Sequence, residues 1–211
     1  VSWTGKVKGS GNASLSVENN ADEKGNMECR KGGKYYVFGT KPLLDTANEY
    51  YYDSSSDSLY VWMPDGGKPG SRVEVKARQH AFDFHGVSNV VLKNLHIFGS
   101  DIVTGEDSRN ITLDGLQALY VYHSSSASKT YGSQSNTGIK LEGKGHNVRN
   151  CEIAYSSGNC IILSGEDMRI VNNYIHDGGY IGSGAAPVTF RGGSRNCIVS
   201  HNTLKRAGRT I

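Results

Sequence analysis

The sequence is poor in several features that mark common classes of protein. Its 211 residues include only 4 prolines, 2 tryptophans and 4 cysteines, and they contain no run of about 18 apolar residues. The lack of such a run excludes a membrane-spanning helix. The formal net charge is only +3, and the basic residues are scattered rather than gathered in a run interleaved with aromatic residues. We therefore expect no nucleic-acid ligand.

The cysteines also lack the spacings that mark a metal or redox site. Cys29, Cys151, Cys160 and Cys197 form no C-x-x-C pair, and no His lies at metal-ligand spacing from them. Three of them fall in expected strands, where Cys commonly behaves as a small buried apolar residue. We predict free thiols, with a disulfide or a zinc site as the alternative.

One three-part phrase recurs along the second half of the chain. It consists of an aliphatic residue, then Asn or a substitute two residues later, then an aliphatic residue three positions further on. The copies are Leu92, Asn94, Ile97; Leu113, Gly115, Ala118; Val148, Asn150, Ile153; Ile170, Asn172, Ile175; and Val199, His201, Leu204. Recurrence at offsets of roughly 20 to 35 residues indicates a solenoid in which each copy is one coil.

The middle position of the phrase predicts a sharp bend between two short strands. Gly enters left-handed backbone conformations freely, and Asn and His are enriched there. The residue after each bend should continue the interior, and Asn173 and Asn202 would then bond in a ladder from coil to coil. The alternative is an antiparallel sandwich with Asn in hairpin turns. Hairpins favour Asn-Gly pairs, which are mostly missing here.

A second strand precedes each phrase and ends on Gly. The four runs occupy residues 82–86, 139–143, 161–165 and 188–192. Alternation places their aliphatic and aromatic side chains inside, Phe190 among them, and it places acids, bases and hydroxyls outside. The outward residues are Asp83, His85, Lys140, Glu142, Ser164, Thr189 and Arg191. This pattern predicts a long polar groove on the outer face.

The first part of the chain is less regular. Residues 50–63 read as a hairpin around the turn DSSSDS, and a Gly/Pro-rich segment is followed by an expected strand at residues 71–77. We predict a β-rich capping region at residues 1–78, packed on the first coil, and β-helix coils at residues 79–211 with an incomplete last coil. We interpret the chain as part of a longer protein, with further coils or a neighbouring subunit covering the open end.

Several stretches resemble a known family. SNVVLKNLHIFGS, GHNVRNCEIAYSSGNCIILSG, IVNNYIHDGGY and NCIVSHNTLKRAGRT resemble right-handed parallel β-helix repeats of the pectate-lyase-like superfamily, over about residues 80–211. Residues 35–67 resemble the segment that leads into the β-helix of secreted bacterial proteins, many assigned to carbohydrate breakdown. The resemblance implies an all-β, right-handed parallel β-helix, a secreted or cell-surface location, and a polysaccharide or oligosaccharide ligand. The fold alone does not identify a substrate.

Candidate chemistry lies after the third strand of each coil. Neighbouring coils lie about 4.8 Å apart, so residues at equivalent positions share one patch. These residues are Tyr120, Tyr122 and His123; Tyr155; His176, Asp177 and Tyr180; and Lys205, Arg206 and Arg209. The outward residues His85 and Arg191, with Tyr120, Tyr122, Tyr155 and Tyr180, are the candidates for substrate binding.

The family resemblance allows two reactions. Glycoside hydrolysis needs paired carboxylates, for which Asp177 and Glu142 are the candidates and Glu166 or Asp167 the substitutes. We expect this reaction, with His176 in the same patch. The alternative is β-elimination on a uronic acid, in which a Lys or Arg removes a proton beside a carboxylate neutralised by Arg or Ca²⁺. Lys205, Arg206 and Arg191 would serve it. No other cofactor is expected.

Each of these residues also has a structural interpretation. Asp177 and His176 can form an ordinary polar turn, and Glu142 and Arg191 can be surface charges in a weak salt network. The competing class of protein is non-catalytic, a β-helix surface, fibre or assembly protein. Paired carboxylates in a groove would favour the enzyme, whereas a flat outer face would favour the assembly.

Overall fold

The computed structural model describes residues 5–12, 14–18, 32–123, 137–180 and 185–207. Two compact units divide the chain. Cys29–Val75 forms one unit, and Val1–Glu28 together with Lys76–Ile211 forms the other. Within the described residues the helices are the single 3-10 turns η1 (Lys41–Leu43) and η2 (Gly70–Arg72), and neither is long or apolar enough to cross a bilayer.

The smaller unit contains the hairpin that the sequence predicts. Strands β3 (Tyr50–Asp53) and β4 (Ser58–Val61) pair antiparallel. The expected strand at residues 71–77 is wrong, because η2 covers its start and residues 73–79 are not in a strand. Val75 is 72% exposed. Alternating valines supply β-propensity, but a strand also needs a pairing partner. In the other unit, β1 (Val7–Gly11) and β2 (Ser14–Val17) form a separate antiparallel pair.

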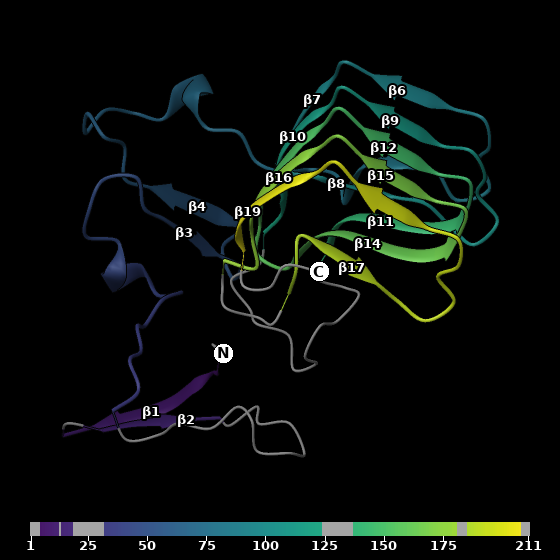
Figure 1. Cartoon of the computed structure of the whole chain (residues 1–211). Helices are drawn as coiled ribbons and strands as arrows, with labels where there is room; N and C mark the ends of the chain where they lie inside the picture. Colours follow the sequence, from purple (N-terminus) through teal and green to yellow (C-terminus); the bar gives the residue numbers. More distant parts are fainter. Residues whose placement is uncertain (1–4, 13, 19–31, 124–136, 181–184, 208–211) are drawn as a thin grey trace. The chain divides into compact units, whose positions relative to one another are not determined.

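The rest of the described chain is a right-handed parallel β-helix, in which each coil adds one strand to each of three five-stranded sheets (Figure 1). The first sheet contains β5 (His80–Asp83), β8 (Asp101–Val103), β11 (Thr137–Lys144), β14 (Asn159–Glu166) and β17 (Val188–Phe190). The second sheet contains β6 (Val91–Lys93), β9 (Thr112–Asp114), β12 (Asn147–Arg149), β15 (Arg169–Val171) and β18 (Ile198–Ser200). The third sheet contains β7 (His96–Phe98), β10 (Gln117–Tyr122), β13 (Glu152–Ser156), β16 (Tyr174–Gly178) and β19 (Thr203–Ala207).

The core is built from side chains that repeat in register between coils. Leu113, Val148 and Ile170 are aligned neighbours in the second sheet, and none is more than 1% exposed. Two predicted interior residues are exceptions, because Leu95 is 39% and Phe190 is 41% exposed. Both lie in terminal coils of the described stack, where a neighbouring coil covers only one side. The alternation of the strands is otherwise as predicted.

The predicted bends are confirmed at every copy of the phrase. The φ angles are +53° at Asn94, +65° at Gly115, +56° at Asn150, +58° at Asn172 and +56° at His201. All five residues are therefore left-handed. The aliphatic residues on either side of the bend can point inward because this conformation turns the chain from the second sheet into the third.

The asparagine ladder is also confirmed. The Asn173 side chain is buried, and its Oδ1 accepts the Cys151 N–H at 2.9 Å. The Asn202 Oδ1 accepts both the backbone N–H and the Nδ2–H of Asn173, each at 2.9 Å. The ladder gives partners to amides that would otherwise be costly to bury.

The predicted free thiols are confirmed for three of the cysteines. Cys151 and Cys160 are buried and Cys197 is half-buried, and all three are free. Burial raises the pKa of Cys160 to about 12, so the thiol stays protonated and unreactive at neutral pH. Cys29 lies outside the described residues.

One fully buried histidine links two coils of the core. The Ile111 N–H donates to Nδ1 of His146 at 3.1 Å, and Nε2 of His146 donates to the Glu142 carbonyl at 2.6 Å. This pattern requires the neutral imidazole, because Nδ1 must accept. Burial lowers the pKa of His146. Protonation would add a charge to the core and remove the bond from Ile111.

We predict that His146 makes the β-helix acid-sensitive. Its pKa is lower in the folded chain than in the unfolded chain, so its stabilising effect is present above the unfolded value of about 6.5 and is lost as the pH falls toward the folded value. The free energy of unfolding should fall by at most about 1.4 kcal/mol per pH unit in that range. In His146→Gln the dependence of the free energy of unfolding on pH should be weaker. Substitution of the exposed His96 in His96→Gln should leave this dependence unchanged. Urea titrations at several pH values measure it, and equal slopes in the two variants would contradict the prediction.

Candidate functional site

A pocket of about 370 Å³ opens on the outer face of the β-helix, where the first sheet begins. Its lining comes from the segment before β5, the start of β5, the end of β10, and strands β8 and β11. The lining residues are Lys76, Gln79, His80, Asp101, Val103, Tyr122, Thr137 and Lys140. Polar and charged side chains therefore dominate the lining, and only one of them is a carboxylate.

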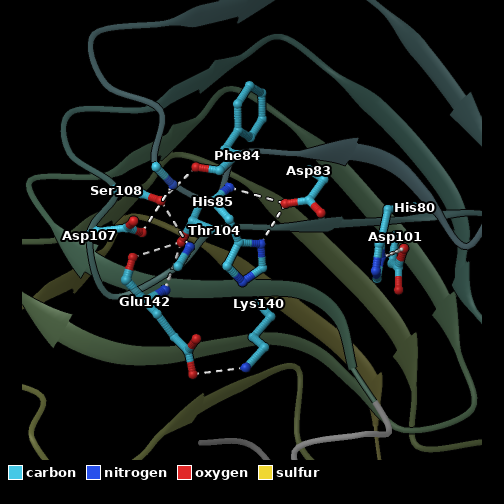
Figure 2. Close-up of polar contacts among 12 residues, drawn as sticks. His80, Asp83, Phe84, His85, Asp101, Thr104, Asp107, Ser108, Lys140 and Glu142 are labelled. Atoms are coloured by element: carbon cyan, nitrogen blue, oxygen red, sulfur yellow. Dashed lines mark hydrogen bonds and ion pairs between the residues drawn. The ribbon is translucent and has the colours of Figure 1, made fainter.

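His80 and Asp101 form the best-defined pair in this pocket. They are aligned neighbours on β5 and β8, and Nδ1 of His80 lies 2.8 Å from Oδ1 of Asp101 (Figure 2). Their side chains are 25% and 12% exposed. A carboxylate at Nδ1 holds the imidazole in one orientation and makes Nε2 the nitrogen that can accept a proton.

Two further charge pairs lie on the same face. Nζ of Lys140 is 2.8 Å from Oε1 of Glu142, and the His85 ring turns toward Asp83 (Figure 2). Hydrogen bonds from the backbone N–H and the ring of His85 lower the pKa of Asp83. The His85 ring lies over Gly105, where an added Cβ would come within 2.5 Å of the ring. Glycine at position 105 therefore leaves room for this imidazole.

The outer face is not the continuous polar groove that the sequence predicts. Val103 and Ile162 occupy outward positions of the first sheet, on the two strands that flank Lys140 in β11. They are only 7% and 0% exposed. These covered apolar positions interrupt the polar column.

One buried hydroxyl in the pocket has no hydrogen-bond partner among the residues that the structure describes. Thr137 is 5% exposed, and within that part of the chain its Oγ1 makes no hydrogen bond. The hydroxyl of Thr104, the residue that follows β8 in the first sheet, does have partners. It donates to the Glu142 carbonyl and accepts the Glu142 N–H, both at 2.7 Å. A buried polar group without a partner costs free energy, so the Thr137 hydroxyl is suited to a bound molecule in the pocket.

We predict opposite effects when these two hydroxyls are replaced by methyl groups. Thr137→Val removes an unsatisfied group, so the free energy of unfolding should stay constant or rise by about 1 kcal/mol. Thr104→Val leaves the Glu142 N–H and carbonyl without the hydroxyl and should lower the free energy of unfolding by about 1–3 kcal/mol. Chemical denaturation measures both. Equal losses would show that Thr137 has a structural partner.

A second polar cluster lies at the end of the third sheet. Arg206 donates through Nε and Nη2 to the two carboxylate oxygens of Asp177, each at 2.6 Å, and Nδ1 of His176 lies 2.5 Å from Asp177. Nε2 of His176 lies 3.2 Å from Glu152, which also accepts a bond from Gln117 at 2.8 Å. The imidazole of His176 is thus held between two carboxylates.

The electrostatics of this cluster favour ionised carboxylates. Arg206 first, and His176 after it, hold the pKa of Asp177 far below its usual range. Hydrogen bonds from Gln117 and His176 lower the pKa of Glu152. Neither carboxyl is therefore suited to act as a protonated general acid at neutral pH.

The structure brings some predicted site residues together. His176, Asp177 and Arg206 are in contact, and Lys205 is aligned with His176 on the next strand. Tyr155 meets the His176 ring edge-on at 5.5 Å. Tyr120 stacks on Tyr155 at 4.8 Å, whereas Tyr122 lines the pocket.

Glu142 is not close to Asp177. The end of β16 lies beside the start of β14, where the Gly179 N–H bonds to the Gly158 carbonyl at 2.9 Å. Glu142 is aligned with Ser164, five residues beyond Asn159 at the start of β14. At about 3.3 Å per residue, this places Glu142 about 16 Å farther along the strand direction. The expected carboxylate pair is therefore split between two regions.

The remaining predicted residues occupy other places. Glu166 and Asp167, the substitute carboxylates, lie at and just after the end of β14, 3.6 and 3.1 Å from Nζ of Lys144. Arg191 follows β17, and its Nε is buried without a partner in the described part of the chain. Tyr180 stacks on His123 with ring centroids 5.9 Å apart and hydrogen-bonds to its ring. Arg209 lies outside the described residues.

Sequence reasoning missed His80, Asp101, Thr137 and Glu152 as site residues. A signal was present for the first two, because His80 and Asp101 are 21 residues apart, the same offset as Leu92 and Leu113 in the repeated phrase. Extending the 21-residue offset to the residues before Leu92 aligns His80 with Asp101. Glu152 directly precedes Ile153, whereas its partner His176 directly follows Ile175, which is aligned with Ile153. The two residues therefore occupy different positions in the repeat, and the repeat spacing does not pair them.

Comparison of the chain with protein-family models, curated proteins and solved structures found no match.

The described lining of the pocket does not offer the ligands of a calcium site. In the part of the chain that the structure describes, no group of three or more His, Cys, Asp and Glu side chains could hold a metal ion. Calcium takes six to eight oxygen ligands, often from several carboxylates. The pocket lining offers one carboxylate, Asp101, which is already bonded to His80.

Proposed function

We propose that this chain is an exported, pectate-lyase-like β-helix protein that binds a uronate unit of an acidic polysaccharide in the first-sheet pocket and cleaves the chain by β-elimination. The observation that carries the proposal is the pocket lining. It combines a carboxylate-oriented imidazole, a phenol and two lysines in one cavity. These are the groups that proton removal beside a carboxylate requires.

The same observation favours elimination over hydrolysis. A glycosidase needs two carboxyl groups about 5 to 9.5 Å apart on either side of the scissile bond. The pocket lining has only Asp101, and the pair expected from the sequence is separated along the strands. Asp177 is moreover ionised by its bidentate contact with Arg206, which does not suit the acid role.

Each reactive group in the pocket then has a role. Nε2 of His80, oriented by Asp101, takes the proton from the carbon beside the uronate carboxylate. The electron pair forms the carbon–carbon double bond and expels the glycosidic oxygen, which takes a proton from the Tyr122 phenol. Lys76 and Lys140 lie in the lining and stabilise the carboxylate, on which negative charge develops. No step uses calcium.

Lys140 can serve this purpose despite its ion pair with Glu142. The pair is partly exposed, with side chains 28% and 16% accessible. Such pairs contribute little stability, so exchange of Glu142 for a substrate carboxylate costs little. The unpartnered Thr137 hydroxyl provides a further donor for the bound sugar.

The proposal is tested by incubating the protein with a panel of acidic and neutral polysaccharides. Ultraviolet absorbance detects unsaturated uronide products, and a reducing-end assay detects every cleavage. We expect both signals with an acidic polysaccharide. His80→Gln should lower kcat at least about 100-fold, because general base catalysis contributes that much. His201→Asn, which removes an exposed histidine at a bend that Asn tolerates, should leave kcat unchanged.

Other outcomes separate the alternatives. Reducing ends without the absorbance, lost in Asp177→Asn, would identify a hydrolase and overturn the elimination. Absence of product from every polysaccharide would contradict an enzyme and leave a binding or assembly role.

Thr137→Val should raise KM with little change in kcat, because its hydroxyl binds sugar in the ground state as well as in the transition state.

A further inference from the structure

Three columns of left-handed residues run along the β-helix, one at each corner of the coil. The column between the second and third sheets contains only Asn, Gly and His, as described above. The column between the first and second sheets contains Asn89, Asn110, Gly145, Asp167 and Asn196, with φ angles between +51° and +76°. These residue types tolerate positive φ at little cost.

The column at the end of the third sheet is different. Its residues are Gly99, Tyr120, Tyr155, Asp177 and Arg206, with φ angles of +70°, +54°, +59°, +53° and +48°. Positive φ is a genuine outlier for a bulky residue and strains the backbone. The same chain uses only Asn, Gly, Asp and His at its other two corners. The tyrosines and the arginine are therefore in place for their side chains, not for the bend.

Aromatic rings from this corner form a strip across three coils. Phe98 lies beside Tyr120 with ring centroids 5.1 Å apart, and Tyr120 stacks on Tyr155 at 4.8 Å. Phe98 is 73% exposed and Tyr120 is 41% exposed. Because these rings are in contact from coil to coil, they form a continuous aromatic surface on which a ligand can stack.

The next coils flank the strip with fixed polar groups. The Asp177–Arg206 pair follows Tyr155 in the column, and the His176 ring joins the two parts through its edge-on contact with Tyr155. Tyr174 stacks on this ring with ring centroids 4.2 Å apart. Glu152 and Asp177 bond both nitrogens of His176, which is only 4% exposed. The rings are thus held on a rigid polar support.

We infer that this strip, made of Phe98, Tyr120 and Tyr155 with the flanking Asp177–Arg206 pair, is a second carbohydrate-binding surface. Sugar rings lie with their C–H faces on the aromatic rings, and the flanking carboxylate and guanidinium bind hydroxyl groups at the edge. The ligand is a polysaccharide chain rather than a protein, because the strip consists of three rings beside hydrogen-bonding groups rather than a broad apolar patch.

The surface is separate from the pocket in its chemistry. The strip holds sugar by stacking, which does not need a uronate, whereas the pocket is built for a carboxylate. The inference rests on the proposed function only in taking a polysaccharide as the ligand. Its role is to keep a long chain on the protein while the pocket acts on one unit.

The experiment is affinity electrophoresis of the full chain in gels that contain polygalacturonate or neutral xylan. Tyr120→Asn with Tyr155→Asn removes two rings and replaces them with a residue that tolerates positive φ. We expect retention by the polysaccharide to weaken about tenfold or more, while the unfolding temperature stays constant or rises. Phe98→Ser, at a strongly exposed position without backbone strain, should weaken retention on its own.

The control is Tyr50→Asn, which removes a tyrosine that is 67% exposed in the other unit and should leave retention unchanged. Cleavage of a short oligouronide should also be unchanged in the strip variants. Unchanged retention in the strip variants would overturn the inference, even if the pocket cleaves uronides. If retention depends on the strip but the protein has no lyase activity, the result would support the binding surface and contradict only the proposed function.

Discussion

In-register parallel pairing between coils is the constraint on which the rest of this structure depends. Each strand of the β-helix bonds to the equivalent strand of the next coil, about 4.8 Å away. A residue type that repeats at one position therefore becomes a column. Aliphatic residues form the core, Asn173 and Asn202 form a buried ladder, and left-handed residues form the corners. Backbone strands and equivalent side chains therefore both repeat at the distance between coils.

The same spacing governs the polar groups. Inside the stack a polar side chain can bond to an adjacent coil, as His146 does with Ile111. On the outer face, side chains from consecutive coils meet as pairs, as His80 meets Asp101. One mode of packing thus supplies both the buried bonds that stabilise the β-helix and the oriented imidazole of the pocket. It also aligns Tyr120 and Tyr155 for stacking.

Features that recur along the chain were predictable from the sequence, and single contacts were not. Asn94 and its equivalents lie at bends because Asn tolerates left-handed backbone, which is a local property. The strand expected at residues 71–77 failed because alternating valines show propensity without a partner to pair with. The placement of Tyr120 and Tyr155 in left-handed backbone could not be foreseen, since their type argues against it.

The sequence by itself determined that the chain coils, where each coil bends between the second and third sheets, and which columns are buried, because those depend on residue type and on the repeat. Only the tertiary structure decided which polar residues meet. Asp177 contacts Arg206 rather than approaching Glu142, and His80 contacts Asp101. The physical reason is that the coils differ in length, so equal spacing in the sequence does not mean equal position in space. The alignment between coils is set by backbone pairing across the whole stack.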